Sequence, residues 1–241
     1  YTTLFRSTPL VGDRVEIQIT DQEKKLAIIE KIEPRKNEIK RPKIANIDQI
    51  VFIISTKNPK PDLLMLDKQL AYAEKMGIDS IIVINKIDLQ DTYREIEELY
   101  KKAGYNIIIT SAKQGQGIDE LKKQLKNKIS VFSGNSGVGK SSIINVLFET
   151  NKTREGEISK KNKKGKNTTT DTKLYELEKD TYIADTPGFS SLTLDDIDEN
   201  ELKEYFIEFD EVDSCRFGNK CIHENEPSCG VKEAVEEGER S

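Results

Sequence analysis

A glycine-rich stretch in the middle of the chain combines the residue types that bind phosphate. Residues 133–141 read SGNSGVGKS and fit the pattern G-x-x-x-x-G-K-[ST]. Glycines let backbone N–H groups curl around phosphate oxygens, and a helix beginning at Lys140 would direct its positive end at them. We expect Lys140 at the β and γ phosphates and the Ser141 hydroxyl on Mg²⁺. The predicted phosphate-binding residues are Gly134, Asn135, Ser136, Gly137, Val138, Gly139, Lys140, Ser141 and Ser142.

Two further motifs indicate which base the chain binds. INKID (84–88) lies at the carboxyl end of a predicted strand, and TSAKQG (110–115) follows the next strand. The Asp88 carboxylate can accept hydrogen bonds from N1–H and the 2-amino group of guanine, a donor pair that adenine lacks. The N–H of Ala112 could meet guanine O6. Taken alone, the first motif could be a loop cap and the second a helix start. The predicted base-binding residues are Asn85, Lys86, Asp88, Ser111, Ala112 and Lys113.

Residues downstream of the phosphate loop complete the predicted nucleotide site. DTPG (185–188) follows a strand, so Asp185 can hold Mg²⁺ through water and the Gly188 N–H can sense the γ phosphate. NTTTD (167–171) has the threonine-rich form of a first switch segment. We expect Thr169 to ligate Mg²⁺ and to act with Lys140 in catalysis. Thr168 is the alternative ligand.

The cysteines and the histidine of the chain predict a metal site. Cys215, Cys221, His223 and Cys229 form a C-x₅-C-x-H-x₅-C pattern that contains all three cysteines and the only histidine. An odd number of cysteines argues against a disulfide framework. Three thiolates and one imidazole complete a tetrahedral zinc shell without an open position, so we expect one structural Zn²⁺. The alternative is three buried thiols beside an incidental histidine.

Alternating strands and helices must position these motifs. Short apolar runs predict buried parallel strands, and amphipathic segments between them predict helices. The phosphate loop and its helix fall inside this alternation, which is typical of a doubly wound α/β sheet. The predicted strands are 49–55, 80–86, 106–110, 128–133, 172–178 and 181–185, and the predicted helices are 63–77, 93–104, 118–127 and 140–148.

The two ends of the chain predict separate domains. Residues 13–20 and 26–32 alternate with period two, as in a half-exposed hairpin, and a polar connector at 33–43 marks a boundary. The acidic tail is short of apolar runs, and the metal would stabilise it. We predict a β domain at 1–40, a nucleotide-binding domain at 41–195 and a zinc-binding domain at 196–241. Tyr1 in place of Met indicates that the numbering begins within a longer chain.

Composition narrows the class of protein. The 241 residues are 35% hydrophobic and 34% charged, with a net charge of −5. No apolar run is long enough to span a bilayer and nothing resembles a signal peptide, so we expect a cytoplasmic protein without a membrane partner. Seven Lys or Arg residues lie between Lys152 and Lys166, whereas acidic residues dominate 195–213. The basic run is either a solvated loop or a surface for RNA.

The order of the motifs is unusual. Two base-reading motifs precede the phosphate loop, and both switch segments follow it, whereas ordinary GTPases begin with the phosphate loop. The domain is therefore expected to be a circularly permuted P-loop GTPase domain. The chain resembles the bacterial ribosome small-subunit-dependent GTPase A (RsgA) family across nearly its whole length. The stretches that carry the resemblance are TPLVGDRV (8–15), NEIKRPKIANIDQ (37–49), VFSGNSGVGKSSIIN (131–145), ADTPGFSS (184–191) and CGVKEAVEEGE (229–239).

The resemblance implies an N-terminal OB barrel, of which residues 1–32 supply only two strands, and the same zinc ligands, although the family's first spacing is commonly one residue shorter. It also implies contacts with ribosomal RNA and proteins of the small subunit. The family usually has His, implicated in hydrolysis, where this chain has Asn167. A catalytic role therefore does not transfer to this residue.

We accordingly expect a monomeric GTPase that binds GTP and GDP and acts in late maturation of the small ribosomal subunit. Its turnover should be slow alone and stimulated by the subunit. One alternative is a guanine-nucleotide-dependent binding or scaffold protein without significant turnover. Another is a transcription-related zinc protein with an accessory nucleotide site.

Overall fold

The computed structural model describes residues 8–40, 42–89, 93–155, 172–185, 197, 198, 200–209 and 215–238, without the side chains of 150–155 and 219. Its main body is a six-stranded sheet with the strand order β7-β6-β5-β8-β10-β9. Every neighbouring pair is parallel except β9 and β10. The strands are β5 (Gln49–Ser55), β6 (Asp79–Asn85), β7 (Asn106–Ile109), β8 (Ile129–Ser133), β9 (Lys173–Glu178) and β10 (Thr181–Asp185).

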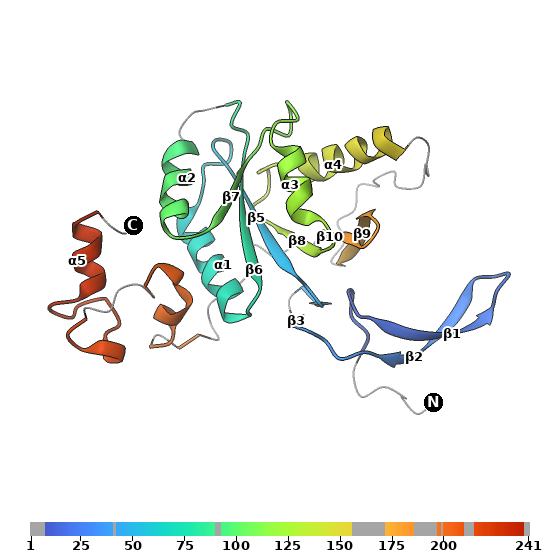
Figure 1. Ribbon diagram of the computed structural model, residues 1–241, viewed down its shortest axis with the longest axis horizontal. Helices are drawn as coiled ribbons and strands as arrows, with labels where there is room; N and C mark the ends of the chain where they lie inside the picture. Colours follow the sequence, from blue (N-terminus) through green and yellow to red (C-terminus); the bar gives the residue numbers. More distant parts are fainter. Residues whose placement is uncertain are drawn as a thin grey trace.

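Helices cover both faces of this sheet (Figure 1). α1 (Leu63–Lys75) and α2 (Tyr93–Lys102) pack on one face, where Phe52 and Ile54 of β5 point. α3 (Ile118–Leu125) and α4 (Lys140–Glu155) pack on the other face with Val51 and Ile53. Alternate residues of β5 thus serve two cores, and all seven of its residues are buried. This is the doubly wound α/β arrangement that the sequence predicts.

The carboxyl ends of β5, β6, β7, β8 and β10 meet at one edge of the sheet, because these strands run parallel. Ligands of open α/β sheets bind at this edge. The phosphate loop, at 134–139, connects β8 to α4 and therefore lies there. α4 continues to Glu155, seven residues beyond the predicted end at 148.

The residues before β5 form two small antiparallel sheets. β1 (Val15–Asp21) and β2 (Leu26–Ile32) make the predicted hairpin, which extends away from the main sheet (Figure 1). β3 (Glu38–Ile39) and β4 (Ile44–Ala45) pair inside the segment predicted as a polar connector. That segment is structured because Ile39 and Ile44 are fully buried against the main sheet. In the part of the N-terminal region that the structure describes, no complete OB barrel is present.

The C-terminal region contains short helices that the sequence pattern did not predict. η2 (Leu202–Tyr205) packs on α1. η3 (Ile207–Phe209) lies close to the end of α2, because the Ile207 Cδ1 atom would be only 3.4 Å from a Cβ added to Gly104. η4 (Gly218–Lys220) and α5 (Gly230–Glu236) follow. Within the described residues, no helix is both long and apolar enough to cross a membrane.

Candidate functional site

Asn85 joins three of the predicted motifs at the sheet edge. It is the last residue of β6, and its side chain is buried. Its Nδ2 donates to the Val138 carbonyl of the phosphate loop at 2.9 Å. Its Oδ1 accepts from the Ala112 N–H and the Thr110 hydroxyl, each at 3.1 Å. One side chain therefore fixes the spacing between the phosphate loop and both base-reading motifs.

Lys86 forms a second connection to the phosphate loop. Its ammonium group donates to the carbonyls of Gly137 and Asn58. Thr56 fixes the backbone of Lys86, because the Thr56 hydroxyl donates to the Lys86 carbonyl at 2.9 Å. Thr56, Asn58 and Thr110 were not among the site residues predicted from the sequence. A polar run directly after buried β5, at the same edge of the sheet, is the signal that could have indicated the first two.

The predicted base reader Asp88 is held in place by the neighbouring motif. The Ser111 hydroxyl donates to Asp88 Oδ1 at 2.7 Å and thereby orients the carboxylate. Ser111 is itself buried and closes its own loop by exchanging backbone hydrogen bonds with Gln116. The Ala112 N–H, expected to meet guanine O6, donates to Asn85 in this structure. Lys113 is exposed.

Two glycines of the phosphate loop are required by close contacts. Gly134 has φ +144°, and a Cβ there would lie 2.2 Å from the Ile53 carbonyl oxygen. Gly139 has φ +105°, and a Cβ there would lie 2.3 Å from Asn85 Nδ2. Positive φ and these distances exclude any side chain. The loop is therefore seated directly on β5 and on the residue that ends β6.

The charged groups of the predicted phosphate and Mg²⁺ site lie around the start of α4. The Lys140 ammonium donates to the carbonyls of Gly134 and Asn135. Burial lowers the pKa of Lys140 from its ordinary value, and the negative charge of Asp185 acts against this shift. Ser141 and Ser142 are exposed in the first turn of α4, next to the exposed Ser136 and Gly137. Asp185 ends β10, whose last residues pair with β8.

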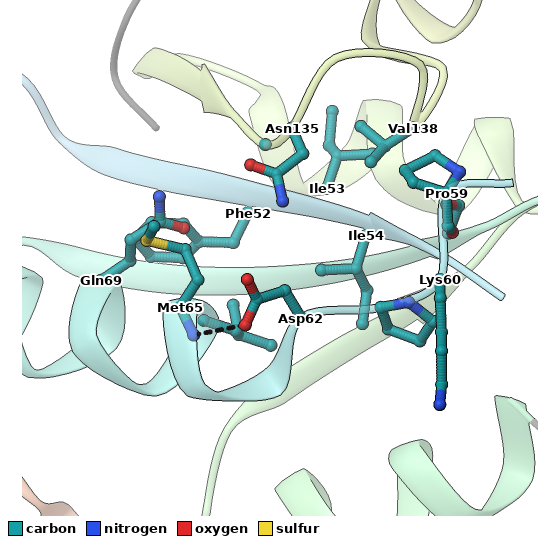
Figure 2. A pocket seen from close by; sticks show the side chains of 14 residues that line it. Phe52, Ile53, Ile54, Pro59, Lys60, Asp62, Met65, Gln69, Asn135 and Val138 are labelled. Carbon is teal, nitrogen blue, oxygen red and sulfur yellow. Dashed lines mark hydrogen bonds between the residues drawn. The ribbon is translucent and has the colours of Figure 1, made fainter. Parts of the chain in front are cut away.

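A separate pocket of about 350 Å³, including open solvent, lies between the phosphate loop and α1 (Figure 2). Apolar side chains such as Phe52, Met65 and Val138 form much of its lining. Asp62 caps α1 there by accepting from the Met65 N–H at 3.0 Å. The Gln69 Nε2 atom is buried without a hydrogen-bond partner. Asp88, Ser111 and Ala112 do not line this pocket, so it is distinct from the base-reading motifs.

The structure brings together the four predicted metal ligands. One ligand atom from each of Cys215, Cys221, His223 and Cys229 lies within 4.8 Å of the others. His223 Nδ1 is 3.3 Å from the Cys229 sulfur and 3.6 Å from the Cys215 sulfur, and these two sulfurs are 4.0 Å apart. All three cysteines are free thiols. This cluster could hold a metal ion.

The surroundings of the cluster affect its protonation. Burial raises the pKa of the Cys215 thiol, but hydrogen bonds from the backbone of Val231 and Gly230 and from the Cys221 and Cys229 side chains together lower it more, and the net shift is downward. Burial is the main cause that raises the pKa of Cys221 to about 11. Burial, together with the positive charge of Lys203, lowers the pKa of His223. A neutral imidazole is the form that binds a metal.

Other predicted residues of the nucleotide site lie outside the described residues. These are the switch residues Asn167, Thr168 and Thr169, and Gly188 with the following Phe189.

Comparisons with known proteins agree with this geometry. The family profile described as "RsgA GTPase" matches residues 32–195. A relative from Alkaliphilus metalliredigens, named small ribosomal subunit biogenesis GTPase RsgA, is 44% identical over 235 residues, which are 96% of this chain and 80% of the relative. A protein of the same name from Ruminiclostridium cellulolyticum is 46% identical over 234 residues, 96% of this chain and 76% of the relative.

Two solved structures have the same fold. The crystal structure of YjeQ from Thermotoga maritima matches with a TM-score of 0.80 and 41% identity, covering 97% of this chain and 80% of that one. The crystal structure of YloQ, described as a circularly permuted GTPase, matches with a TM-score of 0.77 and 36% identity, covering 98% of this chain and 77% of that one. The circular permutation predicted from the motif order is confirmed.

Proposed function

Because this chain belongs to the RsgA GTPase family, we propose that it binds and hydrolyses GTP during maturation of the small ribosomal subunit. The observation that supports this most directly is the position of Asn85, whose buried side chain ties the phosphate loop to both base-reading motifs. The relatives at 42–46% identity are named small ribosomal subunit biogenesis GTPases. The partner is accordingly the small ribosomal subunit, and the protein acts in the cytoplasm as a monomer.

The nucleotide lies along the sheet edge in this proposal. The Asp88 carboxylate, oriented by Ser111, reads the guanine N1–H and 2-amino groups. Backbone N–H groups of the phosphate loop surround the phosphates, and the Lys140 ammonium leaves its carbonyl partners for the β and γ phosphates. Mg²⁺, which neutralises charge that develops during phosphoryl transfer, would be held by oxygens of Ser141, Thr169 and Asp185. Gly188 would contact the γ phosphate.

Hydrolysis by the isolated protein is expected to be slow. Many GTPases orient the attacking water with a Gln that directly follows the Gly of DxxG, whereas this chain has Phe189. Asn167 cannot act as a base near neutral pH. Positioning and charge stabilisation by the phosphate loop, Lys140 and Thr169 remain, so we expect about 10⁻⁴ to 10⁻² s⁻¹. Because Phe189 has no hydrogen-bonding side-chain group, a binding protein without significant turnover is the second candidate function.

Measuring GTP hydrolysis with and without purified small subunits separates the two candidates. We expect slow turnover alone, acceleration by the subunit, and no turnover in Lys140→Ala under either condition. Nucleotide binding without turnover, even at saturating subunit, would favour the second candidate. Fast turnover alone that is lost in Asn167→Ala would show that the chain supplies its own water-positioning residue.

Base specificity has a separate test. Asp88→Asn replaces an acceptor oxygen with an amide donor, so affinity should shift from GTP towards xanthosine triphosphate. Competition binding with the two nucleotides measures the shift. If Asp88→Asn binds GTP as tightly as the original protein, Asp88 does not read the base.

The metal in the cysteine and histidine cluster is Zn²⁺ in this proposal. Bonds of about 2.3 Å to sulfur and about 2.0 Å to nitrogen in a tetrahedron place two sulfurs about 3.8 Å apart and a sulfur and a nitrogen about 3.5 Å apart. The observed separations of 4.0, 3.6 and 3.3 Å fit these values. Four protein ligands leave no position for substrate, so the ion would be structural. Metal analysis of protein purified without chelator should find one zinc per chain.

A further inference from the structure

The Glu226 carboxylate accepts hydrogen bonds from three backbone N–H groups in the loop that contains His223, the histidine of the metal cluster. Its Oε1 accepts from Ile222 N at 2.7 Å, and its Oε2 accepts from Glu224 N at 3.0 Å and Asn225 N at 3.1 Å. Successive N–H groups that converge on one anion form a concave backbone nest. The loop from Ile222 to Asn225 is therefore folded around the side chain of Glu226.

His223 lies inside this loop in a conformation that requires support. Its φ is +63°, in the left-handed region that few residues other than glycine adopt. This conformation places its Nδ1 atom 3.3 Å from the Cys229 sulfur. The edge of the Phe209 ring packs against the imidazole, with ring centroids 5.1 Å apart and an interplanar angle of 69°. Phe209 limits the position of the ring, whereas the hydrogen bonds of Glu226 fix the backbone that carries it.

The cysteine ligands have other supports. Cys229 directly precedes α5, and the Cys221 carbonyl accepts from the Lys203 ammonium at 3.0 Å. The Cys215 carbonyl accepts from Gly218 N at 2.9 Å. None of these contacts involves Glu226. The N–H groups that Glu226 accepts lie on both sides of His223, so the imidazole is the ligand whose backbone depends most directly on the carboxylate. The Ile222 N–H also belongs to the same peptide unit as the Cys221 carbonyl, which Lys203 holds from the other side.

We infer that Glu226 is a positioning residue of the metal site. Its carboxylate holds the loop in the conformation that places His223 as the fourth ligand, and it does not itself contact the ion. The inference rests on the metal site proposed above. Residues that orient metal ligands through hydrogen bonds typically change metal affinity 10-fold to 100-fold when they are replaced. We expect an effect of this size, arising mainly from His223.

Glu224 provides a matched control in the same loop. Its side chain is exposed, whereas its backbone N–H donates to Glu226 and its carbonyl accepts from Lys232. Glu226→Gln and Glu224→Gln each remove one negative charge from the same loop. Only Glu226→Gln replaces an oxygen that accepts backbone N–H groups with an NH₂ group. The difference between the two variants therefore separates loop geometry from attraction between a carboxylate and a cation.

The experiment measures Zn²⁺ affinity by competition with a chromogenic chelator, using the full chain. We expect Glu226→Gln to weaken affinity at least 10-fold and Glu224→Gln to change it less than about 2-fold. In a His223→Ala background, Glu226→Gln should have little further effect, because the ligand it positions is absent. Co²⁺ is a second probe. The visible spectrum of the Co²⁺-loaded Glu226→Gln variant should move towards that of His223→Ala, whereas Glu224→Gln should keep the original spectrum.

Specific outcomes overturn the inference. Equal loss of affinity in the two Gln variants would show a charge effect, and an unchanged affinity in Glu226→Gln would show that the carboxylate does not position the ligand. If Glu226→Gln weakened Zn²⁺ affinity as much in the His223→Ala background as in the original protein, Glu226 would act on some other ligand. If the original protein binds neither Zn²⁺ nor Co²⁺, the metal site itself is wrong. Guanine nucleotide binding, measured on every variant, should be unchanged, so global unfolding is distinguished from loss of the loop.

Discussion

At the scale of single residues, Asn85 has more structural consequences than its place in a base-reading motif indicates. The Nδ2 atom of its carboxamide donates to the phosphate loop, and the Oδ1 atom accepts from the loop after β7. Both partners are backbone groups in a region buried from water. A buried backbone group that loses its partner costs more free energy than the bond contributed when it was made.

Asn85→Ala should therefore destabilise the fold and weaken nucleotide binding together. It leaves the Val138 carbonyl and the Ala112 N–H without the partner that Asn85 provides. An unsatisfied buried group costs about 1–3 kcal/mol, so the two together predict a loss of about 2–6 kcal/mol in the free energy of unfolding. Urea unfolding and nucleotide titration measure the two effects. Asn106→Ala, at an exposed position that begins β7, is the control and should change stability by less than about 0.5 kcal/mol. Equal stability of the two variants would contradict the role of Asn85.

At the scale of elements, the segment from η2 to η3 links the metal cluster to the nucleotide-binding domain. η2 packs on α1, while Lys203 of η2 bonds to the Cys221 carbonyl and Phe209 of η3 packs on His223. Among the described residues, few apolar side chains are buried around the cluster: Cys221, Cys229 and Val231 form its core, with Phe209 and Cys215 against them. A core this small would depend on the proposed ion for its stability.

Removing the metal should consequently loosen both η segments together with residues 215–238. Hydrogen exchange of the chelated protein should show lost protection there and retained protection in β5 and β6, whose residues lie in the sheet core. Nucleotide affinity should change little, because no metal ligand contacts the base-reading motifs or the phosphate loop in the described structure. Protection of 202–209 that survives chelation would show that this segment docks on α1 independently of the ion.

The Asp13–Arg35 ion pair ties the segment before β1 to the turn after β2. Arg35 Nε lies 2.7 Å from Asp13 Oδ1 and Arg35 Nη2 lies 2.9 Å from Oδ2, and the Asp13 side chain is only 3% exposed. The hydrogen bond from Arg35 is the largest cause that lowers the pKa of Asp13, and burial opposes it. Since the folded-state pKa is lowered, the stabilisation is present above about pH 4 and is lost as pH falls through the folded-state pKa.

Asp13→Asn should destabilise the N-terminal region at pH 7 and have a smaller effect at acidic pH below the lowered pKa of Asp13, where the carboxyl of the original protein is protonated. Hydrogen exchange of residues 8–47, corrected for intrinsic rates at each pH, measures this difference. Glu16→Gln, which removes the exposed ion pair with Lys31, should have little effect at either pH. A destabilisation by Asp13→Asn that does not depend on pH would show that charge is not the cause.

At the scale of the whole molecule, the distribution of charge predicts how the protein meets the small subunit. The net charge is −5, yet seven basic residues lie between Lys152 and Lys166, directly before the predicted first switch. Binding to bulk RNA should be weak because of the overall acidity. Contacts with the γ phosphate could order the switch and bring the basic run to RNA phosphates.

Association with the small subunit should therefore depend on both nucleotide and salt. We expect tighter binding with a non-hydrolysable GTP analogue than with GDP, and a linear fall of log affinity with log salt concentration. Replacing Lys160 and Lys161 by Gln should reduce that slope, whereas replacing Lys24 and Lys25 in the exposed β1–β2 turn should not. Equal affinity with GDP and the GTP analogue would contradict the switch hypothesis.

Features that depend on the order of residues along the chain could be predicted without the structure. The apolar run of β5 predicted a buried strand, the spacing of the phosphate loop predicted its position between β8 and α4, and the order of the motifs predicted the permutation. Contacts between distant groups could be read from the folded structure alone. Asn85 accepts from the Ala112 N–H, Ile39 and Ile44 are buried in or beside the polar connector, and Glu226 accepts hydrogen bonds from the loop that carries His223. The physical reason is that periodicity and spacing report the conformation of neighbouring residues, whereas hydrogen bonds between loops depend on how the sheet brings their ends together.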